Sequence, residues 1–230
     1  MNETLAFPFS DLIDKTGTRV LTNTVLSVMR VLKRVNPADA YYEAYLGHAA
    51  RQGDSFFDHY HLAWLWGAAK DPKSILEIGT RTGISLCQIL SAMRSLEGVG
   101  VTCFDLFNDG FISPKLVEMN LKALNLNVPV EFVKGDSAQT VPEYFKANPG
   151  KMYDYILVDG NHEKTAARID LENVCDHVAP GGILLFDDIS TAPGECGLRD
   201  VWEQFKSDHL GVFQYGEDYN GKGLGWAIRQ

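Results

Sequence analysis

Residues 74–85, SILEIGTRTGIS, decide the fold of this chain. The apolar run SILEI has the length of a buried strand, and a helical pattern of apolar residues follows it over 84–95. Between them lies a turn with glycine at positions 79 and 83, where the backbone can bend sharply and a ligand can approach it closely. The stretch therefore predicts a strand, a tight turn and a helix in succession.

The same alternation continues along most of the remaining chain. Strands are expected at 99–104, 130–133, 153–158 and 182–186, and helices at 114–124, 140–147 and 163–178. Strands that alternate with helices form parallel β-α-β units, and continuous apolar strands belong to a sheet that is covered on both faces. The predicted fold class is therefore α/β, with a doubly wound, mostly parallel, Rossmann-like sheet.

The last part of the chain predicts an antiparallel addition to this sheet. GVFQY at 211–215 and GLGWAIR at 223–229 flank the polar stretch EDYNGK, which contains a glycine. Two apolar runs around such a stretch indicate a hairpin. The sheet is therefore expected to have seven strands, with an antiparallel hairpin at its C-terminal end.

The first 73 residues have a different pattern. Helices are expected at 21–32, 41–51 and 55–70. Asp71-Pro72 then breaks the helical pattern. We expect residues 1–73 to form a helical cap or lid and residues 74–230 to form the main domain.

The third of these helices is rich in aromatic residues. Phe57, His59 and Tyr60 are candidates for lining an acceptor pocket, whereas Trp64 and Trp66 fit core packing better.

Composition and charge exclude several classes of partner. The formal net charge of −9 repels phosphate backbones, so nucleic acid is not expected to bind. The N-terminal residues lack the features of a signal peptide, and no apolar run is long enough to span a bilayer, so we expect a cytoplasmic protein without a membrane partner. The four cysteines have no C-x-x-C spacing and are expected to be reduced, and no Cys/His cluster in the sequence predicts a zinc site.

An acidic residue at the end of the second predicted strand indicates an adenosine site. Asp105 lies 105 − 79 = 26 residues after Gly79, near the ~20 residues typical for a carboxylate that binds ribose hydroxyls. In the turn G-T-R-T-G, Arg81 stands where a dinucleotide-binding turn has its middle glycine. Glu77 disfavours a pyrophosphate and suits a cationic amino-acid tail, which favours S-adenosylmethionine over NAD. The alternative is that Gly79 and Gly83 only make a tight turn, with Glu77 as a capping residue.

Further cofactor contacts are expected around this turn and at the ends of later strands. The expected cofactor-binding residues are Glu77, Gly79, Thr80, Arg81, Gly83, Ser85, Asp105, Leu106, Asp136, Ser137 and Asp159. Asp136-Ser137 follows the third strand, where contacts to an adenine amino group are usual. An ordinary helix N-cap is the alternative for this pair.

Carboxylates also follow the fourth and fifth predicted strands. Asp159 ends one strand and Asp187-Asp188 ends the other, and ligands of open α/β sheets bind at the carboxyl ends of the strands. If the two strands are neighbours, three carboxylates converge and need a cation, and all-oxygen ligation suits Mg²⁺, Mn²⁺ or Ca²⁺. The alternative is that Asp187-Asp188 only begins a loop.

A histidine lies close to these carboxylates in the sequence. His162 follows Asp159 by three residues, and a helix that started there would hold the imidazole near the same carboxyl ends of the strands. It could take the proton of an acceptor hydroxyl at neutral pH, with a metal binding and orienting the acceptor oxygen. His162 and Asp159 are therefore the expected catalytic residues. A capping or surface histidine is the alternative.

At these residues the chain resembles class I S-adenosylmethionine-dependent methyltransferases, from about residue 74 to residue 229. More narrowly, it is similar to the group of macrocin-type O-methyltransferases and cephalosporin hydroxylase-like proteins. The matching stretches are LEIGTRTGIS, VTCFDLF, YDYILVDGNHEKTAARIDLENVCDHVAPGGILLFDDI and GLRDVWEQF.

The resemblance implies a role for each candidate residue. Glu77 and the Gly79–Gly83 turn would hold the methionine moiety, Asp105 the ribose, Asp159, Asp187 and Asp188 the metal, and His162 would be the base. Relatives often have glutamate where Asp187 stands, so this chain has a shorter ligand arm there. Related enzymes shape the acceptor pocket with their helical N-terminal parts and assemble through them, so a homo-oligomer is among the expectations.

The expected function is therefore methyl transfer to a hydroxyl of a small molecule, such as a sugar, a phenol or a natural product. Two other interpretations are a non-catalytic binding or assembly module on the same fold and a nucleotide-dependent oxidoreductase. Glu77 and the missing third glycine disfavour the oxidoreductase. The intact Asp159, His162 and Asp187-Asp188 argue against loss of catalysis.

Overall fold

The structure is a computed structural model that describes residues 67, 70–108, 112–192, 194, 196–219 and 222–230. The helices expected before residue 67 lie outside the described residues. The same holds for the pocket candidates Phe57, His59 and Tyr60 and for Trp64 and Trp66. The division into a cap and a main domain therefore stays a prediction.

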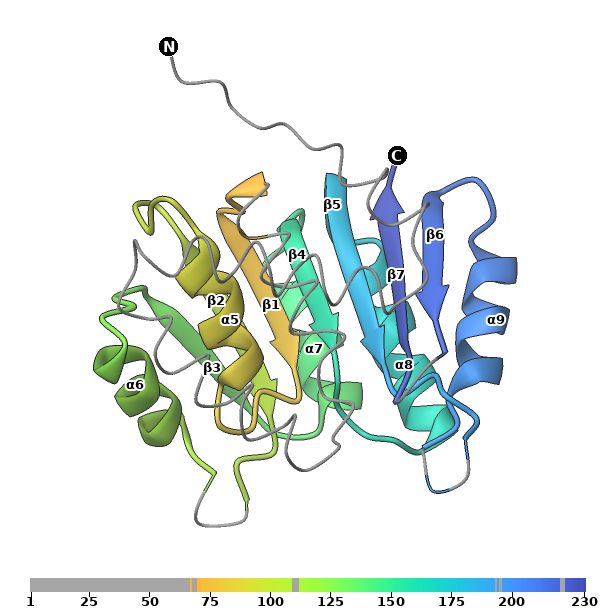
Figure 1. Cartoon of the computed structure of the whole chain (residues 1–230), viewed down its shortest axis with the longest axis horizontal. Helices are drawn as coiled ribbons and strands as arrows, with labels where there is room; N and C mark the ends of the chain where they lie inside the picture. Colours follow the sequence, from red (N-terminus) through yellow and green to blue (C-terminus); the bar gives the residue numbers. More distant parts are fainter. Residues whose placement is uncertain (1–66, 68–69, 109–111, 193, 195, 220–221) are drawn as a thin grey trace.

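Seven strands form one sheet in the order β3-β2-β1-β4-β5-β7-β6 (Figure 1). The strands are β1 (Ser74–Ile78), β2 (Gly100–Asp105), β3 (Val130–Lys134), β4 (Tyr153–Val158), β5 (Val178–Asp187), β6 (Phe213–Asp218) and β7 (Leu224–Arg229). The pairs from β3 to β5 are parallel, and β7 is antiparallel to both β5 and β6. The predicted doubly wound sheet and its antiparallel hairpin are confirmed.

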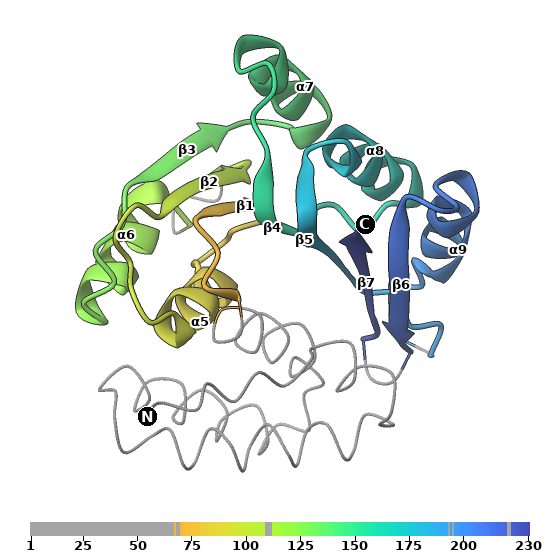
Figure 2. The same ribbon diagram turned by 90° about the horizontal axis from the view of Figure 1, so that it is seen from above.

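Helices cover the sheet in two groups. On one face lie α5 (Ile84–Ala92) and α6 (Pro114–Ala123), and on the other lie α7 (Ser137–Ala147), α8 (Lys164–Cys175) and α9 (Arg199–Asp208) (Figure 2). Within the described part of the chain, no helix has the length and apolar character needed to cross a bilayer.

Alternate residues of the central strands belong to two separate cores. In β1, Ile75 packs in the apolar cluster on the face of α5 and α6, and Leu76 packs in the cluster on the face of α7, α8 and α9. In β4, Leu157 and Val158 divide in the same way. Because both faces are buried, these strands are apolar at successive positions, which is the pattern that predicted them.

One predicted boundary is wrong. The helix expected over 163–178 ends at Cys175, and Val178 already begins β5. The strand expected at 182–186 therefore begins four residues earlier, and residues 179–181 lie within β5, where the pairing with β4 shifts register between Tyr153 and Tyr155. Proline and glycine weaken a regular ladder and are tolerated at such an irregularity.

The turn between β1 and α5 is held in a left-handed conformation at three positions. The φ angle is +85° at Gly79, +49° at Arg81 and +77° at Gly83. A Cβ at Gly79 would overlap the carbonyl oxygen of Asp159, and a Cβ at Gly83 would lie 2.8 Å from Cγ1 of Val117. Both glycines are therefore needed for conformation and for space.

A buried carboxylate lies beneath the end of β4. Asp170 of α8 is 1% exposed, and a Cβ at Gly160 would lie 2.9 Å from its Oδ2 atom. Burial raises the pKa of the Asp170 carboxyl to about 6, Ser137 opposes the rise by hydrogen bonding, and the charge of Asp136 adds to it. At neutral pH this buried group carries a charge that destabilises the fold.

The Asp170→Asn substitution tests this cost. The folded pKa of about 6 is above the ordinary value of 3.8, so the contribution of Asp170 to stability is complete below pH ~4 and is lost as the pH rises through about 6. Asp170→Asn is expected to remove this loss and to raise the free energy of unfolding at pH 7 by about 1–3 kcal/mol. Urea denaturation between pH 4 and pH 8 measures both effects.

The control is Glu118→Gln, since Glu118 is exposed on α6. This exchange should change the free energy of unfolding by less than about 0.5 kcal/mol. If the Asp170→Asn chain keeps the pH dependence of the natural chain, burial of this carboxyl does not control stability.

The close approach at Gly79 gives a second prediction. Gly150 has a φ of +79° and nothing within 4 Å of an added Cβ, so Gly150→Ala measures the conformational cost alone, about 1–2 kcal/mol. Gly79→Ala is expected to destabilise the chain by about 1–3 kcal/mol more, because the Asp159 backbone must move. Equal losses for the two variants in chemical denaturation would contradict the close approach.

Candidate active site

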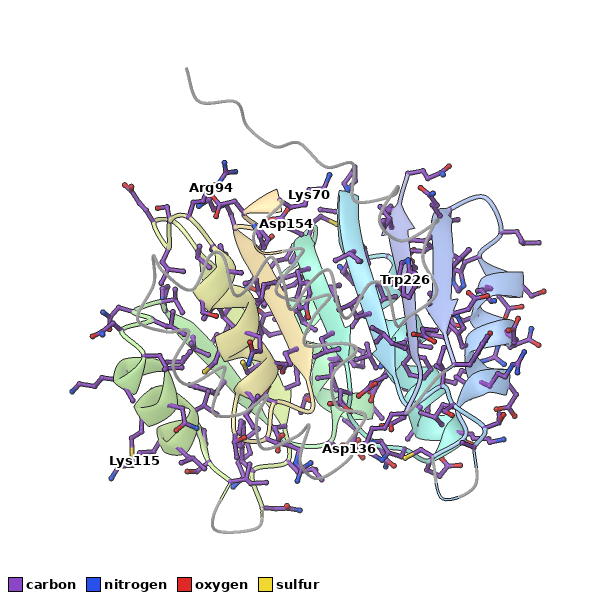
Figure 3. All side chains as sticks on the ribbon, in the orientation of Figure 1. Lys70, Arg94, Lys115, Asp136, Asp154 and Trp226 are labelled. Carbon is purple, nitrogen blue, oxygen red and sulfur yellow. The ribbon has the colours of Figure 1, made fainter. Side chains whose placement is uncertain are left out.

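The predicted site residues gather at the edge of the sheet where the parallel strands end. In Figure 3, Asp136 lies at this carboxyl edge and Asp154 lies at the opposite edge. A cavity of about 710 Å³ is present at the carboxyl edge. Its lining includes Gly79, Thr80, Arg81, Ser85, Asp105, Leu106, Asp136, Ser137, Asp159 and His162.

Asp105 at the end of β2 is positioned by backbone N–H groups. The N–H of Arg81 donates to Oδ2 at 2.8 Å, and the N–H of Phe107 donates to Oδ1 at 2.9 Å. A carboxylate has about four acceptor positions, so these two bonds leave capacity for ligand hydroxyls. The geometry suits a group that accepts hydrogen bonds from a ribose.

Two of the predicted cofactor residues are not part of the cavity lining. Glu77 is 2% exposed, and the Ser85 hydroxyl donates to its Oε1 atom. Glu77 therefore lies behind Ser85, which lines the cavity and is hydrogen-bonded to it. Gly83 is the N-cap of α5 and lies against Val117. The roles that we expect for Glu77 and Gly83 toward a cofactor stay predictions.

Asp136 and Ser137 form a helix start that also lines the cavity, so the N-cap and the cofactor contact are compatible. The Ala138 N–H donates to Oδ1 of Asp136 at 3.0 Å, so Asp136 is the N-cap of α7. The cap explains why α7 begins at Ser137, earlier than the predicted residue 140. Both residues also line the cavity, so the helix start itself faces the space available to a ligand.

The predicted convergence of carboxylates is confirmed. Because β4 and β5 are neighbours, one oxygen atom each of Asp159, Asp187 and Asp188 lies within 4.8 Å of the others. Asp187 and Asp188 are 4% and 1% exposed. Neither oxygen of Asp188 accepts an aligned hydrogen bond within the described part of the chain. Three oxygen donors at this spacing fit a hard divalent cation.

Lys222 was missed by the sequence analysis. Its Nζ atom lies 3.6 Å from Oδ1 of Asp188, and the residue lines the cavity. Burial lowers the pKa of the Lys222 ammonium, but the charges of Asp188, Asp187 and Asp159 raise it further, so the net shift is upward. The stretch EDYNGK predicted only a turn, and the pairing of β7 with β5 brings its lysine to the site.

His162 lies just before α8 rather than in its first turn. Glu163 is the N-cap, and its Oε2 atom accepts from the Ala166 N–H at 3.0 Å. Nε2 of His162 lies 3.0 Å from Oδ2 of Asp188 and 3.7 Å from Oδ1 of Asp159. Asp159 raises the pKa of the imidazole, burial opposes the rise, and the charge of Asp188 adds to it.

Cys196 also lies at this site, although the sequence predicted only that the cysteines are reduced. Its Sγ atom lies 3.1 Å from Nδ1 of His162. All four cysteines are free, as expected. The sequence showed no Cys/His cluster that predicts a zinc site, whereas two loops that are distant in sequence bring Cys196 and His162 together.

The comparisons with known proteins agree with this fold. Residues 76–189 match a family model described as a methyltransferase domain. No curated protein matches the sequence. The macrocin-type grouping that we expected within this larger family stays a prediction.

Several solved structures have the same fold. The O-methyltransferase from Bacillus cereus, in complex with S-adenosylhomocysteine, has a TM-score of 0.60 and 18% identity, covering 91% of this chain and 100% of its own. TomG, an O-methyltransferase from Streptomyces achromogenes, has a TM-score of 0.59 and 19% identity, covering 86% and 98%. The methyltransferase PaMTH1 from Podospora anserina has a TM-score of 0.58 and 15% identity, covering 100% of both chains.

At these identities the structural likeness shows the fold, and the family match adds the methyltransferase domain. Residues 76–189 therefore form a methyltransferase domain, and the strand order gives the chain the class I methyltransferase fold.

Proposed function

We propose that this protein is an S-adenosylmethionine-dependent O-methyltransferase that acts on a hydroxyl of a small molecule, assisted by a divalent cation such as Mg²⁺. The observation that carries the proposal is that one cavity contains both the turn that follows β1, with Asp105, and His162 with Asp159. Direct transfer requires the donor and acceptor sites to be held in one space at a fixed orientation.

The donor half of the cavity fits an adenosine with an amino-acid tail. Asp105 has acceptor capacity for ribose hydroxyls, and Asp136 and Ser137 line the cavity at the start of α7. Bound S-adenosylmethionine supplies a methyl group already activated by its sulfonium, so the protein contributes mainly positioning and proton transfer. The B. cereus enzyme binds S-adenosylhomocysteine and TomG binds S-adenosylmethionine on the same fold.

In the acceptor half of the cavity, a side chain must take the proton that the acceptor hydroxyl loses. His162 can hold this proton at Nε2, because the carboxylate of Asp188 is 3.0 Å away and stabilises the imidazolium. The side chain of His162 is 44% exposed, so an acceptor can reach it. Asp159, at 3.7 Å from the same nitrogen, helps to orient the ring.

Asp159, Asp187 and Asp188 would hold the cation. Their oxygens are close together, and those of Asp188 lack aligned hydrogen bonds within the described residues. A cation there would bind the acceptor oxygen and lower the pKa of its hydroxyl. Lys222 already supplies one positive charge next to Asp188, so the carboxylates are partly compensated before any cation binds.

One of the solved structures supports the acceptor class that we propose. TomG acts in the synthesis of tomaymycin. A sugar, a phenol or a natural product with a free hydroxyl is the acceptor class that we propose for this chain. The negative net charge of the chain disfavours a nucleic acid as the acceptor.

Calorimetric titration with S-adenosylhomocysteine tests the donor site. The natural chain is expected to bind it, and Asp105→Asn is expected to weaken binding by about tenfold or more, because a hydrogen bond to a charged group is lost. Asp154→Asn is the control, since Asp154 lies at the opposite edge of the sheet and bonds to the N–H groups of Lys73 and Ser74. Absence of binding to the folded natural chain would remove the methyltransferase proposal.

A panel of phenols and sugars with labelled S-adenosylmethionine tests the acceptor half. His162→Gln is expected to lower kcat by about 10²–10⁴-fold without weakening S-adenosylhomocysteine binding. Chelation should lower the rate of the natural chain, and added Mg²⁺ should restore it. A rate that chelation leaves unchanged would refute the cation's part, and an unchanged rate in His162→Gln would refute the base.

A further inference from the structure

A second group of metal-ligating side chains lies between α8 and α9, outside the cavity. Glu172 and Cys175 are three residues apart on α8 and therefore on one side of the helix. His209 caps the C-terminal end of α9, which packs beside α8 on the same face of the sheet (Figure 2). The 12 residues of α8 span about 18 Å, and His162 precedes the other end of this helix, so the group is separate from the active site.

The three donor atoms face one point. Nε2 of His209 lies 3.5 Å from Sγ of Cys175 and 3.5 Å from Oε2 of Glu172. Zinc binds sulfur at about 2.3 Å and imidazole nitrogen at about 2.0–2.1 Å, which places two ligands on one tetrahedral edge roughly 3.5 Å apart. The two separations from Nε2 match those around a four-coordinate ion, and all three donor atoms lie within 4.8 Å of one another.

The histidine ring is already oriented for ligation. Nδ1 of His209 lies 3.0 Å from the carbonyl oxygen of Phe205, which can only accept, so Nδ1 carries the proton. The lone pair of Nε2 is then directed at Cys175, whose thiol can donate to it, and Glu172 lies at the same distance from this nitrogen. Metal-binding histidines commonly donate their other N–H to a carbonyl in this way. The ring also packs against Phe205, with centroids 4.5 Å apart, which restricts its rotation.

The surroundings allow an ion to enter and to be neutralised. The side chains of Glu172 and His209 are 38% and 18% exposed, and Cys175 is buried. Burial raises the pKa of the Cys175 thiol to about 12, and Asp176 and Glu172 add to the rise, so an ion must displace the thiol proton to bind. Thiolate and carboxylate then balance the two charges of the ion. Arg229 lies nearby, but its guanidinium is held by the carbonyls of Asp176 and Val178.

The active-site group of His162, Asp188 and Cys196 is less suited to such an ion. There the thiol faces Nδ1 and the carboxylate faces Nε2, so the ring stands between the other two donors. We propose that Glu172, Cys175 and His209 bind a zinc-class divalent metal ion, with water in the fourth position, and that the ion links the C-terminal ends of α8 and α9.

Titration of the reduced, metal-free full chain with Co²⁺ tests this site. A thiolate-to-Co²⁺ charge-transfer band is expected at one equivalent, with the visible bands of a four-coordinate ion, and Zn²⁺ should displace it. At a hundredfold excess over Kd, Zn²⁺ should raise Tm by roughly 5 °C or more. The chain has four cysteines, all within the described residues, so the band can be assigned by substitution.

Matched variants separate the two Cys/His groups. His209→Gln and Glu172→Gln are each expected to weaken Co²⁺ binding by at least about tenfold. Glu172 is partly exposed, so Glu172→Gln keeps the test valid if the His209 exchange disturbs the end of α9. Cys196→Ser should leave the band unchanged. The proposal is overturned if the natural chain gives no band, if the band survives both exchanges, or if Cys196→Ser removes it.

Discussion

The site depends on one backbone contact, between Gly79 after β1 and Asp159 after β4. The two strands are parallel neighbours, and the Asp159 N–H donates to the carbonyl of Ile78 at 3.0 Å. After β1 the chain continues to β2 and β3 on one side of the sheet, whereas β4 leads to β5 on the other side. This is the point where open α/β sheets bind ligands. A side chain at position 79 would separate the two turns, so the absence of a Cβ joins the donor turn to the first carboxylate of the acceptor cluster.

The sheet could be predicted because its chemistry is local. Strands buried on both faces are apolar at most positions, so β4 could be predicted from the run YDYILV, in which Asp154 is the one charged residue. Asp159 and Asp187-Asp188 could be placed for a similar reason. Parallel strands end at one edge of the sheet, so residues at the ends of neighbouring strands lie close together. The boundary between α8 and β5 was harder to predict. Val178 continues the apolar stripe of α8 in sequence but belongs to β5 in space, and periodicity alone does not distinguish the two.

The remaining site residues depend on contacts between distant segments. Lys222 approaches Asp188 only because β7 pairs with β5, which no local pattern in EDYNGK indicates. Cys196 approaches His162 across two loops. His209 meets Cys175 because α8 and α9 pack side by side. In each case the residue type is visible in the sequence, but the partner is set by tertiary packing, so a search for short metal-binding spacings finds none of them.

The charge of Asp188 is partly compensated without a hydrogen bond to its carboxylate oxygens within the described residues. Lys222 lies 3.6 Å from Asp188, which is beyond the usual length of a hydrogen bond, so its ammonium offsets the negative charge but leaves the oxygen lone pairs available. His162 approaches at 3.0 Å without an aligned hydrogen bond within the described residues. If Asp188 were fully hydrogen-bonded to cationic side chains, its oxygens could not bind a ligand. Without any nearby positive charge, three adjacent carboxylates would be costly to bury. The intermediate arrangement leaves the oxygens of Asp188 able to bind a cation or an acceptor hydroxyl.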